Sequence, residues 1–387
     1  MDSAQRLITI VCSHYLPHPG GVERYVNLQA KECVRLGFAV RIIAHDTEGM
    51  GWRDELPGIT VYRLKCWSPL SYNRMPFPTS PGQLCYLTRE MLSHRGELTI
   101  VHTRYFLLSL FGCLWARCSG TRLALIDHSS DYIRLGTRWL NAACHVYEHL
   151  MSFAILLFCP RVFGVAQACV RWLRRFGVRK AGVCYNGIDP DQRPTAPVPL
   201  PDVIGKMADR KVVLAVGRLV KEKGVMELVA GFQSFAHDRN DYVLVIIGHG
   251  ELESPLHDAA QTDPKIVFLG RRPLSTVMSV MMQAFVLVNP SNYPEGLPTI
   301  LLEAGLCGLA VISTPCGGAS EIIVHGETGL LIDRGEPTRI DAALRMLDQA
   351  PDLRVRIARN LQQRIVRDFS CAALTERFLF QDMGIPR

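Results

Sequence analysis

The apolar and polar positions at the start of the chain follow a strand, helix, strand order. An apolar run at 7–12 precedes a Gly-Pro loop, and apolar residues then recur at helical spacing from Val22 to Leu36. That spacing predicts an amphipathic helix, and Gly37 marks its end. Because Phe38–Ala44 is a second β-branched run, the pattern predicts a βαβ unit and a parallel sheet.

The same pattern restarts in the second half of the chain. Lys211–Gly217 predicts a strand, Val225–Phe235 a helix, and Tyr242–Ile247 a strand that ends at Gly248. Further short β-branched runs predict strands at Ile266–Leu269, Val286–Asn289 and Ala310–Ser313. The chain is therefore expected to hold two Rossmann-like α/β domains.

A proline-rich segment separates the two patterns. Residues 189–201 (DPDQRPTAPVPLP) hold five prolines in thirteen positions, a density that neither a helix nor a central strand tolerates. A length of 387 residues also suits two domains. We expect an N-terminal domain over 1–195, a C-terminal domain over 196–370, and a final helix over 371–387 that packs back towards the N-terminal domain.

The composition narrows the class of protein. With 48% hydrophobic and 20% charged residues, the chain is neither disordered nor fibrous. There is no CxxC motif among the 13 cysteines. They are scattered singly among apolar runs, for example Cys12, Cys33, Cys85, Cys169 and Cys307. This usage predicts reduced, buried thiols in a cytoplasmic protein. The N-terminus lacks the features of a signal peptide, and the longest uncharged apolar stretch, 149–160, is shorter than the roughly 20 residues of a spanning helix.

Positive charge is concentrated in the first half. Residues 1–195 carry 23 Lys and Arg against 14 Asp and Glu, whereas the remainder carries 20 against 22. This asymmetry predicts an anionic partner for the N-terminal domain. The densest patch lies within 171–180, where Arg171, Arg174, Arg175, Arg179 and Lys180 alternate with Trp172, Leu173 and Phe176. It is either a solvated helix face or a surface for anionic lipid headgroups.

Two carboxylates flank a predicted helix start in the second half. A strand ends at Asn289, a polar loop follows, and a helix is expected from about Pro298. The free N–H groups of such a helix start bind phosphate. Glu303 lies about 7–8 Å along the axis, roughly the step from a diphosphate to a ribose, and Glu295 precedes the helix. The alternative is that Glu295 complements the helix dipole and Glu303 is a surface residue.

Two cations follow the first strand of the second half. Arg218 and Lys223 lie in GRLVKEKG (217–224), at the carboxyl end of a predicted parallel strand, where open α/β sheets bind ligands. Arg can hold a diphosphate with a forked pair of hydrogen bonds, and Lys adds a point charge.

These motifs resemble those of the retaining glycosyltransferases of family 4. The C-terminal half matches in VGRLVKEKG (216–224), VIIGHGELE (245–253), PSNYPEGLPTILLEAGLCGLAVIST (290–314), which holds the E-x7-E pair, and GGASEIIVHGETGLLI (317–332). The N-terminal half matches in HYLPHPGGVERYV (14–26), LIDHSSDYI (125–133) and YNGIDPDQR (185–193). The resemblance implies the GT-B fold, in which two Rossmann-like domains face each other across a cleft.

The resemblance also implies roles for residues of the C-terminal half. Arg218 and Lys223 would hold the diphosphate of a sugar donor, Glu303 the ribose hydroxyls, and Glu295 the transferred sugar. Further substrate contacts would come from the backbone of the helix start and from the loop near the base, namely Gly296, Leu297, Pro298, Thr299, Gly248 and Gly250.

In the N-terminal half the resemblance implies three positions. Gly20 and Gly21 would let the backbone approach the diphosphate, and His128 would reach the donor sugar. His128 also suits a structural role at a strand end. The expected catalytic residues are therefore Glu295, His128, Arg218 and Lys223.

The implied activity is transfer of a hexose-type sugar from a UDP- or GDP-sugar, with retained configuration and without a metal or other cofactor. The acceptor would be a hydroxyl of a glycan or lipid-linked sugar, in the synthesis of cell-surface polysaccharide or glycolipid. We expect a cytoplasmic protein that meets an anionic membrane surface peripherally, and no nucleic acid partner. The alternative is an inactive relative that binds nucleotide sugars as a regulator or scaffold.

Three other motifs are weaker. Gly248-His249-Gly250 begins like a dinucleotide fingerprint, but Glu253 occupies its sixth position, which disfavours an oxidoreductase. Asp189-Pro190-Asp191 has the D-x-D pattern of a metal site but lies in the proline-rich segment. His14 and His18 are separated by Pro17, which prevents the helix that would align them on zinc.

Overall fold

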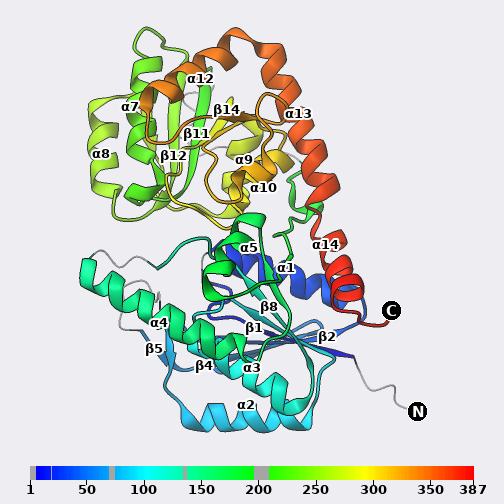
Figure 1. Ribbon diagram of the computed structural model, residues 1–387. Helices are drawn as coiled ribbons and strands as arrows, with labels where there is room; N and C mark the ends of the chain where they lie inside the picture. Colours follow the sequence, from blue (N-terminus) through cyan, green and yellow to red (C-terminus); the bar gives the residue numbers. More distant parts are fainter. Residues whose placement is uncertain (1–5, 19, 69–74, 134–136, 196–208) are drawn as a thin grey trace. The chain divides into compact units, whose positions relative to one another are not determined.

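The computed structural model describes residues 6–18, 20–68, 75–133, 137–195 and 209–387. The chain divides into two compact units, drawn in Figure 1. The first comprises Met1–Gly187 and Cys371–Arg387, and the second Ile188–Ser370. The chain thus passes between the units at Gly187, eight residues before the expected boundary at 195. The proline-rich segment begins inside the second unit, where Pro190–Gln192 forms a short 3₁₀ turn; its residues 196–201 lie outside the described residues.

The first unit is built on an eight-stranded sheet in the order β10-β9-β8-β7-β1-β2-β4-β3. Its strands are β1 (Leu7–Val11), β2 (Ala39–His45), β3 (Arg53–Leu56), β4 (Ile59–Leu64), β7 (Leu98–His102), β8 (Arg122–Asp127), β9 (Val162–Gly164) and β10 (Gly182–Val183). The predicted parallel pairing is confirmed for β1 and β2, but β3 pairs antiparallel with β4 at the edge, so the sheet is mixed. A separate ribbon joins β5 (Cys66–Trp67) and β6 (Phe77–Pro78).

Helices cover both faces of this sheet (Figure 1). They are α1 (Gly21–Arg35), α2 (Pro81–Ser93), α3 (Leu107–Ser119), α4 (Arg138–Leu156), α5 (Gln167–Leu173) and α14 (Cys371–Arg377), which leads into a π-helical turn at Phe378–Asp382. On one face, Leu87 of α2 and Trp115 of α3 pack with Val101 of β7 in a single core. On the other, Arg161 donates to the carbonyl oxygen of Met383 at 2.9 Å, which ties the C-terminal segment to the first unit.

The second unit is a six-stranded parallel sheet in the order β13-β12-β11-β14-β15-β16. Its strands are β11 (Lys211–Arg218), β12 (Tyr242–His249), β13 (Ile266–Phe268), β14 (Val286–Asn289), β15 (Val311–Ser313) and β16 (Leu330–Leu331). The strands predicted from the β-branched runs are therefore confirmed. Their burial on both faces explains why the sequence reads as continuous apolar runs rather than as alternation.

Seven helices of the described residues flank this sheet: α7 (Val225–Phe235), α8 (Glu253–Thr262), α9 (Leu274–Gln283), α10 (Thr299–Leu306), α11 (Ala319–Ile322), α12 (Pro337–Gln349) and α13 (Pro351–Asp368). Phe232 of α7, Leu344 of α12 and Leu244 of β12 are fully buried in one core. The helix expected over 225–235 has the bounds of α7. The fold class, two α/β units with largely parallel sheets, is as predicted.

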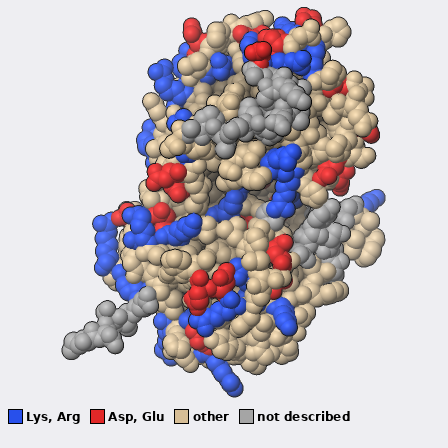
Figure 2. Space-filling model, turned by 180° about the vertical axis from the view of Figure 1, so that it is seen from behind, with Lys and Arg blue, Asp and Glu red and all other residues tan. Residues whose placement is uncertain are grey.

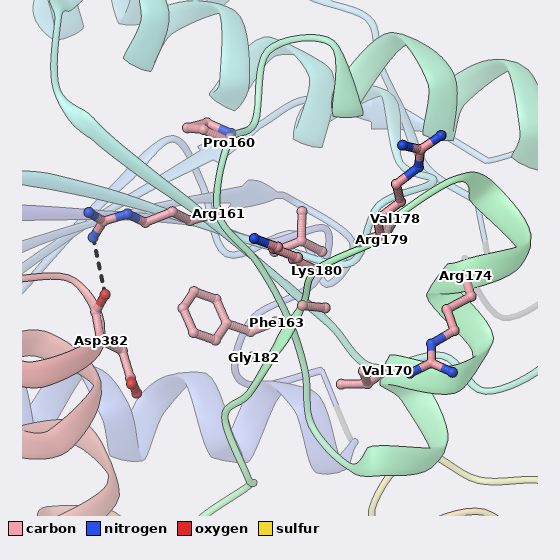
Figure 3. Close-up of a pocket in the computed structure, with 12 residues that line it drawn as sticks. Pro160, Arg161, Phe163, Val170, Arg174, Val178, Arg179, Lys180, Gly182 and Asp382 are labelled. Atoms are coloured by element: carbon pink, nitrogen blue, oxygen red, sulfur yellow. Dashed lines mark hydrogen bonds between the residues drawn. The ribbon is translucent and has the colours of Figure 1, made fainter.

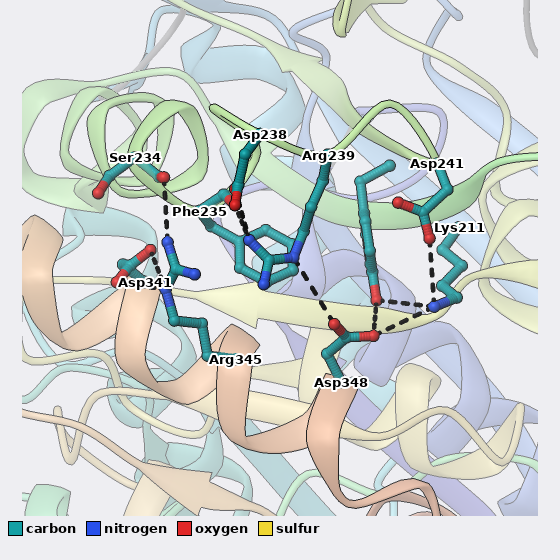
Figure 4. A network of polar contacts seen from close by, with 10 residues as sticks. Lys211, Ser234, Phe235, Asp238, Arg239, Asp241, Asp341, Arg345 and Asp348 are labelled. Carbon is teal, nitrogen blue, oxygen red and sulfur yellow. Dashed lines mark hydrogen bonds and ion pairs between the residues drawn. The ribbon is translucent and has the colours of Figure 1, made fainter.

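Charged side chains close the amino end of the second sheet (Figure 4). Lys211 begins β11, Tyr242 begins β12, and Asp348 is near the end of α12. Asp348 accepts hydrogen bonds from the Tyr242 hydroxyl and, at 3.1 Å, from the Lys211 ammonium. Burial raises the pKa of Asp348, but these two hydrogen bonds outweigh it and leave that pKa below its usual value. The network joins two strands and a helix away from the loops that follow the strands.

All thirteen cysteines are free, and Cys12, Cys33, Cys169 and Cys307 are buried as expected. The expectation is wrong for Cys85, which is exposed because the inner face of α2 is formed by Leu87 and Met91 instead. Within the described ranges, no helix is both long and apolar enough to cross a bilayer. On the face of the molecule in Figure 2, positive and negative side chains occur together on each unit.

Candidate functional site

The strand order of the second unit creates a switch point between β11 and β14. From β11 the chain winds outwards through β12 and β13, and from β14 it winds in the opposite direction through β15 and β16. The loops after β11 and β14 therefore diverge at the carboxyl edge of the sheet, the position at which open α/β sheets bind ligands. Arg218 is the last residue of β11, and Lys223 lies in the loop that follows it. Glu295 lies in the loop after β14.

Arg218 is the last residue of β11 and is exposed. It lies beside His249, the last residue of β12, in the parallel register of the two strands. The strand ends approach closely because Gly248 has no side chain, since a Cβ there would collide with the Gly217 carbonyl oxygen. The Arg218 guanidinium therefore follows a pair of glycines, Gly217 and Gly248, at the ends of the two strands.

Lys223 and Glu295 meet across the switch point. The Lys223 ammonium lies 2.6 Å from a Glu295 carboxylate oxygen, and the two side chains are 18% and 20% exposed. Their loops are joined by a backbone hydrogen bond of 2.8 Å from the Asn292 amide to the Glu222 carbonyl oxygen. The structure thus brings together two residues that lie 72 positions apart in the sequence, and it holds the Lys223 ammonium in one place.

A third loop, after β15, supports Glu295 from below. The Gly318 amide donates to the Gly296 carbonyl oxygen at 2.8 Å. Gly317 has φ +57, and a Cβ at that residue would collide with the Glu295 carbonyl oxygen. No role was predicted for Gly317; its position four residues after β15 and next to a second glycine was the available signal. This turn fixes the backbone that carries Glu295.

Helix α10 starts beside this carboxylate. Pro298 is its N-cap, one residue before the helix rather than inside it, and no side chain caps the N-terminus. Leu297 and Pro298 are buried, whereas Thr299 is half-buried. Glu303 is only 6% exposed, so the alternative of a surface carboxylate is wrong. Glu303 therefore lies inside the fold, among the buried residues of α10.

The N-terminal candidates belong to the first unit. Gly20 and Gly21 begin α1, and Gly20 is extended, with φ −177. A Cβ at Gly20 would collide with the carboxylate of Glu23, which folds back over the helix start. Burial raises the pKa of Glu23. The Glu23 side chain is therefore a local reason for glycine at position 20. Contact of Gly20 or Gly21 with a diphosphate stays a prediction.

His128 follows β8 and pairs with a second histidine that sequence analysis missed. Its Nε2 lies 3.0 Å from Nδ1 of His102, the last residue of β7, and both rings pack against Tyr25 of α1. Burial lowers the pKa of His128 to about 3, and burial together with the neighbouring imidazole lowers the pKa of His102 well below its usual value. Both imidazoles are therefore neutral at neutral pH, which allows one to accept and the other to donate.

The weaker motifs have local explanations. The Gly250 amide donates to the Glu253 carboxylate at 3.1 Å, so Glu253 satisfies a backbone donor of its own loop. Asp189 accepts from the Asp191 amide at 2.9 Å, a turn of the chain itself. His18 pairs with Glu48 at 2.7 Å. In the part of the chain that the structure describes, no group of three or more His, Cys, Asp or Glu is arranged to hold a metal ion.

Two family models match the chain, Glycosyltransferase Family 4 over residues 19–192 and Glycosyl transferases group 1 over residues 200–364. Alpha-maltose-1-phosphate synthase of Mycolicibacterium smegmatis is 25% identical over 87% of this chain and 93% of its own length. The GPI3 subunit of phosphatidylinositol N-acetylglucosaminyltransferase of Saccharomyces cerevisiae is 25% identical over 83% of this chain and 70% of its own length. The structure of Anabaena HepE in complex with UDP-glucose superposes with a TM-score of 0.73 at 19% identity, covering 97% of this chain and 100% of HepE.

The two α/β units, the similar solved structures and the matching family models define a glycosyltransferase of the GT-B fold. The chain belongs to the family 4-type glycosyltransferases that the two models describe.

Proposed function

We propose that the protein is a retaining glycosyltransferase that moves a hexose-type sugar from a UDP- or GDP-sugar to a hydroxyl of a glycan or lipid-linked acceptor, in the synthesis of cell-surface polysaccharide or glycolipid. The observation that carries the proposal is the carboxyl edge of the second sheet, where exposed Arg218 and the Lys223–Glu295 pair lie in the loops around one switch point. The thirteen free thiols suit a cytoplasmic reaction.

In this proposal the cations stabilise the leaving group. A nucleoside diphosphate gains negative charge as the bond to the sugar breaks, and a charge 4 Å away contributes up to about 4 kcal/mol at an effective dielectric near 20. Because Glu295 holds Lys223 in place before the donor binds, little reorganisation is needed in the transition state. The uncapped start of α10 adds free N–H groups. Together these groups would do the work of a divalent metal, so we propose metal-independent transfer.

The remaining site residues contact the two ends of the donor. We propose that Glu303 holds the ribose hydroxyls, that Glu295 contacts the transferred sugar, and that neutral His128 exchanges a hydrogen bond with a sugar hydroxyl. The acceptor hydroxyl attacks on the side from which the diphosphate departs, and its proton passes to the leaving phosphate. This front-face route retains the anomeric configuration without a covalent sugar intermediate on the enzyme.

The relatives support the donor and the acceptor class. HepE was solved with UDP-glucose, and the yeast relative is named for transfer of N-acetylglucosamine to phosphatidylinositol, a lipid acceptor. The positive first unit suits an acceptor with phosphate groups.

The test is turnover of the full chain with a panel of UDP- and GDP-hexoses and with glycan and lipid-linked acceptors. We expect release of the nucleoside diphosphate with one class of donor, unchanged by a chelator, and a product whose anomeric proton matches the donor's configuration by NMR. Binding of nucleotide sugars without transfer or hydrolysis would favour the inactive relative. Inversion of the configuration, or loss of activity with the chelator, would contradict the proposed route.

A further inference from the structure

Helix α4 (Arg138–Leu156) buries two polar side chains, Glu148 and Ser152. The buried face consists of Cys144, Glu148, Ser152 and Ile155. Glu148 and Ser152 bind the fully buried guanidinium of Arg104, at 2.8 Å and 3.1 Å, and Arg104 also binds Asp127 at 2.6 Å. The helix is therefore anchored to the first unit both through this ion-pair network and through Ile155, which is fully buried in the core of that unit.

The opposite face of α4 is an exposed apolar stripe. The α4 stripe consists of Trp139, Val146, Leu150, Phe153 and Leu157, which are between 61% and 69% exposed. At 100° per residue these five positions fall within an arc of about 60° on a helical wheel. A contiguous row of large apolar side chains on the outside of a water-facing helix marks an interaction surface. Helix α4 therefore has a buried face and an exposed apolar face.

The surroundings of the stripe carry positive charge almost exclusively. Residues 137–180 contain seven Lys and Arg and one carboxylate, Glu148, which is buried and paired with Arg104. All seven cations are exposed, and Arg175 borders the stripe, where it lines a hollow of about 480 Å³ with Leu150 and Phe153. No exposed carboxylate in that range of the described chain offsets these cations.

A second hollow in the first unit, of about 530 Å³, continues the positive surface (Figure 3). Arg174, Arg179 and Lys180 line it, together with Arg161 and Asp382. Arg161 is engaged, because it donates to the carbonyl oxygens of Asp382 and Met383 at 3.1 Å and 2.9 Å. The basic segment 171–180 therefore borders both hollows, and it supplies cations to each.

We propose that α4 lies flat in the interface of an anionic phospholipid bilayer, with the α4 stripe among the upper acyl chains and the cations of 171–180 against the headgroup phosphates. An apolar face flanked by Arg and Lys is the composition of helices that bind bilayers in this way. A second copy of the chain fits less well, because a symmetric contact through the stripe would place the Arg175 side chains of both copies near each other. The inference extends the proposed function, since a lipid-linked acceptor would be met at that surface.

Vesicle sedimentation with the full chain tests the proposal. We expect binding to phosphatidylcholine vesicles that contain phosphatidylglycerol, weak binding to pure phosphatidylcholine, and release at high salt. Arg174→Ala/Arg175→Ala should weaken binding by about fivefold per charge. Leu150→Glu/Phe153→Glu should weaken it by more than tenfold, because it removes apolar area and adds two negative charges.

The matched control is Val355→Glu/Val366→Glu, which changes two exposed apolar residues of α13 in the same way. This variant should bind vesicles like the wild type. Circular dichroism and thermal melting establish that each variant is folded. Emission from Trp139, which is 69% exposed, should shift to the blue on vesicle binding, and Trp139→Phe should remove most of that shift.

Three results would overturn the inference: no binding to anionic vesicles at low salt, unchanged binding by Leu150→Glu/Phe153→Glu, or a dimer in analytical ultracentrifugation that this variant dissociates. The last result would make the stripe a subunit interface. The inference and the proposed function fail separately. A chain that turns over a soluble acceptor but ignores vesicles loses only the inference, whereas one that binds vesicles but releases no nucleoside diphosphate loses only the function.

Discussion

The two ends of the sheet in the second unit are held together in different ways. At the amino end, Lys211, Tyr242 and Asp348 bind one another with their side chains. At the carboxyl end, the strands and loops meet through backbone at Gly248 and Gly317, and Arg218 is left exposed. The carboxyl end also has a side-chain ion pair, Lys223 with Glu295, but that pair joins two loops at the switch point, where Arg218 is exposed. The amino end therefore stabilises the unit, and the carboxyl end is where we place its function.

The largest effect is expected at the Lys223–Glu295 pair. Lys223→Ala or Glu295→Gln should lower kcat by about 10²–10³, the cost of losing one preorganised charge in a transition state. Because the two side chains are only 18% and 20% exposed, loss of one partner should also lower the melting temperature, so kcat is measured on variants shown to be folded at the assay temperature. Lys221→Ala, in the same short turn, is the control and should be nearly as active as the wild type. Equal losses of kcat in Lys221→Ala and Lys223→Ala would contradict the specific role given to the Lys223–Glu295 pair.

Gly317→Ala should damage the carboxyl end through the backbone. The added Cβ would displace the Glu295 carbonyl oxygen, and φ +57 is strained for alanine, so we expect a loss of about 1–3 kcal/mol of stability together with weaker donor binding. Gly326 has φ +75 but open space around its Cβ position, so Gly326→Ala tests strain alone. Melting and donor titration of both variants separate the two causes. Intact donor binding in Gly317→Ala would contradict the role given to this turn.

Asp348→Asn should affect stability and leave donor binding unchanged. The substitution removes the charge that pairs with Lys211, at a cost of about 1–3 kcal/mol, and for a unit of this size each kcal/mol lowers the melting temperature by about 2–4 °C. Donor affinity measured by titration should equal that of the wild type. A weakened donor affinity would mean that the amino end is coupled to the site.

The smallest effect is expected in how the free energy of unfolding falls at acid pH. The pKa of Asp348 is lower in the folded protein than its usual value, so its contribution is present above about pH 4 and is lost as the pH falls through the folded pKa. Unfolding by denaturant as a function of pH should therefore show a shallower acid loss in Asp348→Asn than in the wild type. Identical acid limbs would show that this carboxylate is not stabilising in its charged form.

The apolar pattern predicted β1, α1 and β2 of the first unit and β11 to β15 with α7 of the second, because parallel strands are buried on both faces and their β-branched runs are continuous. The pairing of Lys223 with Glu295 was not readable, since it depends on which strands become neighbours in the sheet. The sequence also did not predict that Glu303 is buried, that Cys85 is exposed, or that large apolar side chains of α4 such as Phe153 face outwards. Each depends on what packs against the helix, and in α4 the buried Arg104 draws Glu148 inwards and leaves Phe153 outside.

Isothermal titration of UDP and GDP into the full chain, without added metal, tests the central claim most directly. The account predicts tight binding of one of the two nucleotides to the wild type and to Asp348→Asn, and a loss of at least about two orders of magnitude in affinity in Arg218→Ala/Lys223→Ala, from two charges of up to about 4 kcal/mol each. Equal affinity of the wild type and the double variant, or no binding of either nucleotide, would show that the carboxyl edge of the second sheet does not hold a diphosphate.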